Sequence, residues 1–268
     1  MRSRVLVFLM LLAACGGRPS PGSTTTATDE ATPEADAGTD PPVVSIESRV
    51  RLIHAAIESR DEAVTLVADG TATSAATGYQ FSSAYLSLAP GEHALSARAN
   101  DTELIGASFR FAEGMSTIIA YSTADFPVAL APAADPSRAP ARNSAQVRFF
   151  HAIVGQGALD VCSAPESGRG DGSVIAANVT AGALGAPDTG YLSVPGGAEL
   201  VLQLRAQNAT PCHGRVLGMA RFTPASESNY TLIFVGRSGR HRIAPELLFC
   251  ADPPAIDTSC ATVAVEPH

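Results

Sequence analysis

The chain has 268 residues, of which 46% are apolar, 6% aromatic and 16% charged, and its formal net charge is −8. This length is enough for one large or two ordinary domains with buried cores. The low charged fraction argues against a coiled coil, and the acidic balance argues against a nucleic-acid-binding protein.

Residues 1–14 are typical of an export signal. Two arginines precede a ten-residue apolar run, which is too short to span a membrane as a helix. The run ends in Leu-Ala-Ala-Cys at Cys15, which resembles the bacterial lipobox. The resemblance implies cleavage before Cys15 and lipid attachment to its thiol, and several acyl chains are enough for stable anchoring. The alternative is an ordinary signal peptide in which Cys15 is accidental.

The residues that follow predict where the mature protein lies. Gly16 occupies the position at which Asp retains enteric lipoproteins in the inner membrane. By that analogy we expect an outer-membrane anchor, with the protein facing the periplasm or the cell surface. Residues 15–46 are rich in Thr, Pro and acidic side chains, and such a segment buries too little surface to offset its ordering entropy. We therefore expect a disordered tether that reaches roughly 30 Å.

The rest of the chain repeats itself once. Short segments recur in the same order, and their offset drifts from 97 to 117 residues, so the second copy carries insertions. This order predicts a tandem duplication. The matching segments are Val50–Ala55 with Val147–Ala152, Tyr85–Gly91 with Tyr191–Gly196, Leu104–Gly106 with Val216–Gly218, Arg110–Phe111 with Arg221–Phe222, and Ala134–Pro136 with Ala251–Pro253.

Both copies show the alternation of β-strands. Val50, Leu52 and His54 alternate with Arg49 and Arg51, which is the period of a strand with one buried face. Asp-Gly and Pro-Gly turn sequences separate short runs of this kind. About seven short strands in each copy is the size of an immunoglobulin-like sandwich. We therefore expect an all-β fold with two tandem immunoglobulin-like β-sandwich domains.

These features divide the chain into six predicted segments. The signal peptide and the tether are followed by two β domains, a linker between them and a short tail. The predicted bounds are 1–14 for the signal peptide, 15–46 for the lipidated cysteine and tether, 47–137 for the first sandwich, 138–144 for the linker, 145–256 for the second sandwich and 257–268 for a tail held by a disulfide.

Three motifs in these copies resemble a known family. They are Val-Arg-x-x-His-Ala at Val50 and Val147, the segment Ala63–Gly70, and the Tyr-Leu-Ser element at Tyr85 and Tyr191. They resemble domain of unknown function 4397, which occurs as tandem repeats in secreted and surface-anchored bacterial proteins. The resemblance covers most of residues 48–254, implies immunoglobulin-like β domains and brings no catalytic residues. The loop after His-Ala departs from the family pattern in both copies and is the least transferable part.

Four cysteines remain besides the lipobox cysteine, and all lie in or after the second copy. An even number in an exported chain favours disulfides. Three pairings are possible, and we favour Cys162–Cys212 within the second copy and Cys250–Cys260 across a Pro-Pro turn. A zinc site formed by these cysteines with His213 is the rival interpretation. The chain has no Cys-x-x-Cys pair, so we expect no metal.

His54 and His151 occupy equivalent positions in the two copies. Both are in phase with residues of the predicted core face. A buried, neutral histidine that bonds to a neighbouring backbone group explains this placement. A role as ligand or catalytic base is the functional alternative.

A basic cluster of Arg237, Arg240, His241 and Arg242 lies near the end of a predicted strand. A solvated hairpin tip is the simpler interpretation. The functional interpretation is a weak contact with an anion or a polysaccharide.

The sequence contains no nucleophile elbow, phosphate-binding loop or metal-binding helix motif. We therefore expect no enzymatic activity and no cofactor. The expected function is that of a non-catalytic cell-envelope lipoprotein with a structural, adhesive or ligand-binding role. Its expected partners are the membrane, through Cys15, and an envelope protein or polysaccharide, but not nucleic acid. The alternative is a glycan- or peptide-binding subunit of an envelope complex, and a hydrolase has the least support.

Overall fold

The structure is a computed structural model that describes residues 47–164, 172–185, 190–253 and 260–266. The predicted signal peptide, Cys15 and the tether lie outside the described residues. The described part is made up mainly of strands, and its one helical element is the 3₁₀ turn η1 (Ile57–Ser59). This confirms the predicted all-β fold of the β-sandwich type. No helix within the described ranges is long and apolar enough to cross a membrane.

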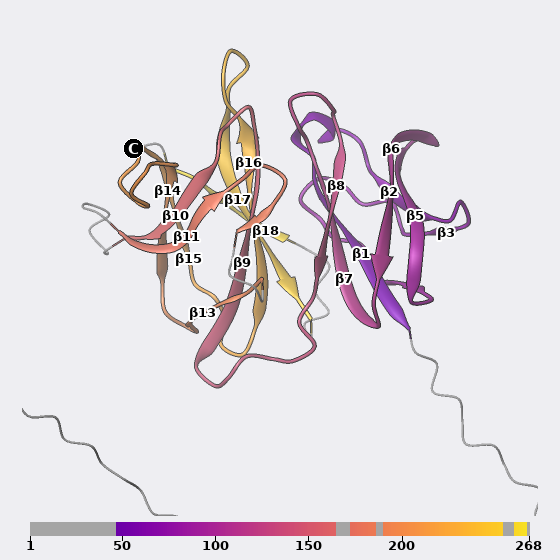
Figure 1. Cartoon of the computed structure of the whole chain (residues 1–268), viewed down its shortest axis with the longest axis horizontal. Coiled ribbons are helices and arrows are strands. Elements are labelled where there is room, and N and C mark those ends of the chain that lie inside the picture. The colour runs from indigo at the N-terminus through magenta and orange to yellow at the C-terminus, as the bar shows by residue number, and fades with distance from the viewer. Residues whose placement is uncertain (1–46, 165–171, 186–189, 254–259, 267–268) are drawn as a thin grey trace, which may run out of the picture. The chain divides into compact units, whose positions relative to one another are not determined.

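We call residues 48–135 the first half, and residues 48–134 of it form two four-stranded sheets. One sheet has the order β4-β1-β7-β8, with β1 parallel to β7, and the other has the order β3-β2-β5-β6. Their strands are drawn in indigo to magenta in Figure 1. The bounds are β1 (Ser48–Ala55), β2 (Thr65–Ala68), β3 (Ala72–Thr73), β4 (Leu86–Leu88), β5 (Gly91–Ala99), β6 (Thr102–Phe111), β7 (Gly114–Tyr121) and β8 (Ala129–Ala134).

The second half, residues 144–264, has a similar plan with more strands. One sheet has the order β12-β9-β16-β17-β18, with β13 also paired to β9 and with β9 parallel to β16. The other sheet has the order β11-β10-β14-β15. The bounds are β9 (Ser144–Val154), β10 (Leu159–Ser163), β11 (Ser173–Val179), β12 (Leu184–Gly185), β13 (Leu192–Pro195), β14 (Leu200–Ala206), β15 (Val216–Phe222), β16 (Asn229–Arg237), β17 (Ile243–Asp252) and β18 (Cys260–Ala264).

Three hydrophobic clusters hold these sheets together. One fills the space between the two sheets of the first half, and a second does the same in the second half. The third cluster joins the halves, because it combines Ile53 and Ile119 of β1 and β7 with Phe150, Ile233 and Leu248 of β9, β16 and β17. The described residues accordingly belong to one compact unit.

The third cluster corrects the expectation that β1 has one solvent-facing side. Val50 and Leu52 face the core of the first half, as the alternation predicts. Arg51 is on the other face, but it is buried rather than exposed, since that face packs against the second half. A period of two shows that a strand has two different faces, but it cannot show that a second sheet covers the polar one.

The structure forms the two disulfides that the sequence favours, Cys162–Cys212 and Cys250–Cys260. Cys162 lies in β10, and Cys212 lies in the connection between β14 and β15. Cys250 and Cys260 are directly opposite each other in the β17–β18 pair. The second disulfide therefore attaches the C-terminal strand to the sheet that contacts the first half.

Candidate functional site

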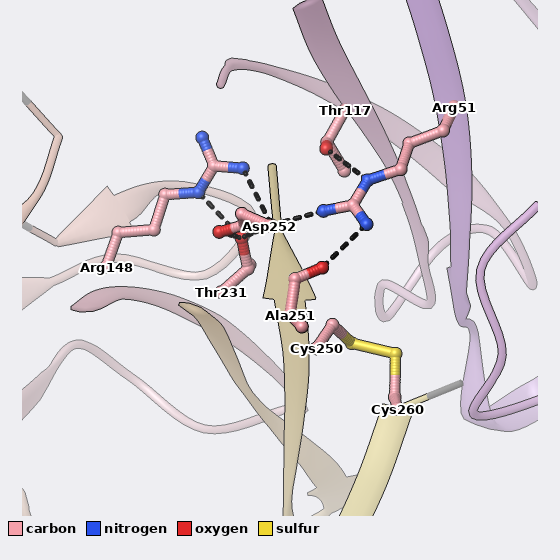
Figure 2. The surroundings of a disulfide bond; sticks show 8 residues. All are labelled: Arg51, Thr117, Arg148, Thr231, Cys250, Ala251, Asp252 and Cys260. Carbon is pink, nitrogen blue, oxygen red and sulfur yellow. Dashed lines mark hydrogen bonds and ion pairs between the residues drawn. A yellow bond between two sulfur atoms is a disulfide. The ribbon is translucent and has the colours of Figure 1, made fainter. Parts of the chain in front are cut away.

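A group of buried charged side chains lies where the two halves meet, with Arg51 at the centre of one part of it. Arg51 lies opposite Thr117 in the parallel pairing of β1 with β7, and its Nε donates to Thr117 Oγ1 at 2.9 Å. Its Nη1 donates to the backbone oxygen of Ala251 at 2.8 Å, and its Nη2 forms an ion pair with Asp252. Figure 2 shows this guanidinium reaching from β1 to the end of β17. An arginine of the first half is therefore neutralised by the second half.

Asp252 is held by its own half as well. Thr231 Oγ1 donates to its carboxylate at 2.7 and 2.9 Å, and the Tyr191 hydroxyl donates to Oδ2 at 2.8 Å. A carboxylate that accepts several hydrogen bonds from fixed donors has a defined orientation. Asp252 is thus positioned by its own half and presented to Arg51.

The same arrangement occurs in the opposite direction. Arg148 lies opposite Thr231 in the pairing of β9 with β16, and its Nε donates to Thr231 Oγ1 at 2.7 Å. Its Nη2 lies 2.6 Å from Asp135 Oδ1, and its Nη1 donates to the Ala134 oxygen at 2.6 Å. Asp135 accepts hydrogen bonds from Thr117 and Tyr85 of its own half at 2.8 Å. Each half therefore contributes one arginine and one aspartate, and each arginine pairs with the aspartate of the other half.

We call these eight side chains the reciprocal network: Arg51, Tyr85, Thr117, Asp135, Arg148, Tyr191, Thr231 and Asp252. The guanidinium carbons of Arg51 and Arg148 lie 5.5 and 4.7 Å from the ring centroids of the tyrosines of their own halves. Arg148 Nη2 also lies 3.7 Å from Asp252 Oδ1, which links the two groups into one. Two arginines and two aspartates leave the reciprocal network without net charge.

The network combines deep burial with complete pairing of its charges. The side chains of both ion pairs are at most 2% exposed. Burial opposes the charge of Arg148, but the carboxylates of Asp252 and Asp135 outweigh it and raise its pKa above the usual value. Burial also raises the pKa of Tyr85 and Tyr191, so both phenols keep the proton that they donate. A buried charge needs such partners, since an unpaired one is very costly.

A pocket of about 530 Å³ adjoins the network along residues 134–141, and Asp135, Tyr191 and Arg138 line it. Asp135 and Tyr191 are both engaged within the network, however. The paired charges of the network therefore join a sheet of one half to a sheet of the other. No group of three or more potential metal ligands occurs among the described residues.

Both sequence-predicted histidines are buried in their own halves, away from the network. His54 Nε2 contacts the backbone oxygens of Ser59 and Glu62 at 3.2 Å, and its Nδ1 accepts a hydrogen bond from the Ala56 amide. His151 Nε2 contacts the Gly157 oxygen at 3.0 Å, and its Nδ1 accepts from the backbone N–H two residues further on, at 3.1 Å. Both rings are fully buried. This geometry agrees with a structural role for both histidines, whose neutral rings carry the proton on Nε2.

The buried histidines predict an acid-dependent loss of stability. Burial lowers the pKa of His54 and His151 below 6.5, so the folded state binds fewer protons than the unfolded state as the pH falls through that value. Their contribution is complete above pH 6.5 and decreases below it, by up to about 1.4 kcal/mol per pH unit for each ring. Urea denaturation between pH 5.5 and 7.5 measures this slope.

The control for this prediction is His93, which is paired with Asp69 near the surface. Hydrogen bonding to Asp69 raises the pKa of His93, so its contribution is lost as the pH rises, which is the opposite direction. His54→Gln should flatten the slope below pH 6.5, whereas His93→Gln should not. An unchanged slope in the His54 variant would show that this ring does not cause the acid sensitivity.

The structure separates the predicted basic cluster into two parts. Arg237 and Arg242 line a pocket together with Arg215, which is distant in sequence. Arg240 and His241 lie in the exposed turn between β16 and β17 and do not line it. Sequence reasoning missed Arg215 because its position depends on the pairing of β14 with β15 rather than on the local turn.

The reciprocal network was also missed as a site, although its signal is present in the sequence. Arg51, Tyr85 and Asp135 each recur at the matching position of the second copy, as Arg148, Tyr191 and Asp252. The repeated histidines, His54 and His151, occupy core positions instead. Repetition of an arginine, a tyrosine and an aspartate was the stronger indication, because buried polar groups need reciprocal partners.

The fold and the network define a class of protein, namely a β-sandwich protein whose two halves are joined by reciprocal ion pairs. Residues 48–162 match the family described as a domain of unknown function (DUF4397). The match is less than half of the chain and runs from β1 through β10. This segment is thus similar to one domain of that family. No curated protein matches the chain.

Proposed function

We propose that this protein is a non-catalytic lipoprotein of the bacterial cell envelope, attached through Cys15 and built from two DUF4397-type domains. The signal peptide, residues 1–14, directs export, and the tether, residues 15–46, holds the β domains away from the outer membrane. The joined domains act as a rigid module for adhesion, envelope structure or ligand binding.

The observation that carries this proposal is the reciprocal network. The arginines and aspartates that would attract a catalytic interpretation neutralise one another across the contact of the two halves, and the tyrosines donate to the aspartates of their own halves. Interfaces within a chain allow domain motion unless they are large and hydrophobic. Here an apolar cluster joins the two halves in addition to the paired charges, which favours a fixed arrangement of the halves. A fixed arrangement suits a protein that presents a surface rather than one that opens and closes around a substrate.

The anchor is tested by Cys15→Ser. The variant lacks the thiol that accepts the lipid, so it should leave the membrane fraction entirely and appear in the soluble fraction. Ultracentrifugation of lysed cells followed by immunoblotting measures the distribution. Ser20→Ala, five residues away in the predicted tether, is the control and should stay in the membrane fraction. Membrane association of the Cys15 variant equal to wild type would refute the anchor.

The binding role is tested separately by capture experiments with the purified full-length protein in detergent. Envelope fractions and a glycan array provide the candidate partners. A specific protein or glycan partner would support the ligand-binding form of the proposal. The absence of both would leave a structural role in the envelope.

The second candidate is the glycan- or peptide-binding subunit of an envelope complex. One observation favours it, namely the pocket that gathers arginines from three separate segments of the second half.

A further inference from the structure

We propose that the arginine pocket of the second half, formed by Arg215, Arg237 and Arg242 with Gln156 and Ser238, binds the phosphate group of an envelope molecule. The inference rests on the ligand-binding form of the proposed function and gives it a chemical class. It does not depend on the lipid anchor.

The pocket brings together residues that are far apart in the sequence. Arg215 precedes β15, Arg237 ends β16 and Arg242 precedes β17, whereas Gln156 follows β9. The pocket has a volume of about 210 Å³, which is smaller than a site for a whole drug-sized ligand. It therefore suits one end group of a larger molecule.

The backbone on which these side chains stand is fixed. The Arg215 oxygen accepts a hydrogen bond from the Ala206 amide at 2.9 Å, which completes the β14–β15 hairpin. Arg237 is paired with Ile243 of β17, so Arg237 and Arg242 lie on the two sides of one hairpin. The Ser238 amide donates to the Val154 oxygen at 2.9 Å, which joins this hairpin to β9. Guanidinium groups on fixed supports lose less freedom when a ligand binds.

The charge of the pocket favours a doubly charged anion. Glu58 of η1 forms an ion pair with Arg237, and both side chains are about 30% exposed. Neither Arg215 nor Arg242 has a carboxylate partner among the described residues. Three guanidinium groups and one paired carboxylate leave two positive charges at the pocket. A phosphate monoester carries nearly two negative charges at neutral pH, whereas a carboxylate carries one, and arginine forks match the phosphate oxygens.

The test is titration calorimetry of the full-length protein in detergent at low ionic strength, with inorganic phosphate as the probe. We expect saturable binding that weakens as sodium chloride is added, because the contacts are between partly exposed charges. Arg215→Gln and Arg242→Gln should each weaken binding about tenfold, which is the low end for hydrogen bonds to charged groups. Arg49→Gln removes the same charge from an exposed site on β1 and should leave binding unchanged.

Glu58→Gln gives a result of opposite sign. It removes the carboxylate that competes for Arg237, so phosphate should bind several-fold more tightly. Circular dichroism and thermal melting of every variant verify that it is folded. General damage to the fold would weaken phosphate binding in every variant, so tighter binding by Glu58→Gln cannot result from it.

Two further ligands identify the recognised group. Glucose 1-phosphate should bind at least as tightly as inorganic phosphate, and glucuronate should bind about tenfold more weakly because it lacks one charge and the tetrahedral group. Equal binding of glucuronate would overturn the phosphate assignment. Failure of phosphate to bind, or equal effects of the Arg215, Arg242 and Arg49 variants, would overturn the site. Capture of an envelope partner despite either result would leave the proposed function intact.

Discussion

Asp252→Ala should lower the free energy of unfolding by about 3–5 kcal/mol, which is the usual cost of removing one partner of a buried ion pair. The variant leaves the buried guanidinium of Arg51 without its carboxylate, and it leaves the Thr231 and Tyr191 hydroxyls without their acceptor. Urea denaturation of the purified full-length protein, followed by circular dichroism, measures the loss.

The matched control is the exposed ion pair between Arg221 and Glu199, whose side chains are 45% and 50% exposed. Glu199→Ala should cost less than about 1 kcal/mol, since solvent screens that pair. An equal cost for the Asp252 and Glu199 variants would contradict the assigned role of the network.

Thr231→Val is a milder change and should cost about 1–3 kcal/mol, because it removes one hydrogen bond to Asp252 and one from Arg148.

A double variant separates the cost of an unpaired charge from the value of the pair itself. Arg51→Met combined with Asp252→Leu removes both charges and fills the space with apolar side chains. It should be more stable than Asp252→Ala alone, because no uncompensated charge remains. A double variant that is less stable than the single one would show that the pair itself contributes strongly.

Removal of the Cys162–Cys212 disulfide should cost about 4 kcal/mol, and removal of Cys250–Cys260 about 3 kcal/mol, because a disulfide restricts the conformational freedom of the unfolded chain. The difference follows from the sequence separations of 50 and 10 residues. Paired Cys→Ala variants and urea denaturation measure both effects. Reducing agent should destabilise the wild type and leave a chain that lacks both disulfides unchanged.

Peptide mapping without reduction tests the pairing directly. It should recover one fragment that joins the peptides of Cys162 and Cys212 and another that joins those of Cys250 and Cys260. A Cys162–Cys250 fragment would show that the pairing is wrong.

The Cys250–Cys260 variant has a further expected consequence, because Cys250 lies two residues before Asp252 and belongs to the cluster between the halves (Figure 2). Combined with Thr231→Val, its loss should cost less than the sum of the two separate effects, because each change already weakens the contact on which the other acts.

Several properties of this protein follow from local sequence. The alternation of Val50 and Leu52 with Arg51 was enough to predict a β-strand, because the period of two is a property of the extended chain itself. The Asp-Gly and Pro-Gly turn sequences between short alternating runs indicated an all-β fold. The cysteine pairs could also be predicted from the sequence, since Cys162 and Cys212 lie in one repeat and Cys250 and Cys260 are only 10 residues apart.

Only the tertiary structure decided how the polar faces of the strands are used. Local alternation places Arg51 and Arg148 opposite the core face, where solvent would be the default partner, and both are instead fully buried between the halves. Nothing within either repeat specifies this, because each arginine finds its aspartate in the other repeat. The position of Arg215 beside Arg237 and Arg242 likewise depends on strand pairings across the second half. Burial and charge pairing between distant segments are properties of the assembled sheets, whereas the periodicity that forms each strand is encoded within a few residues.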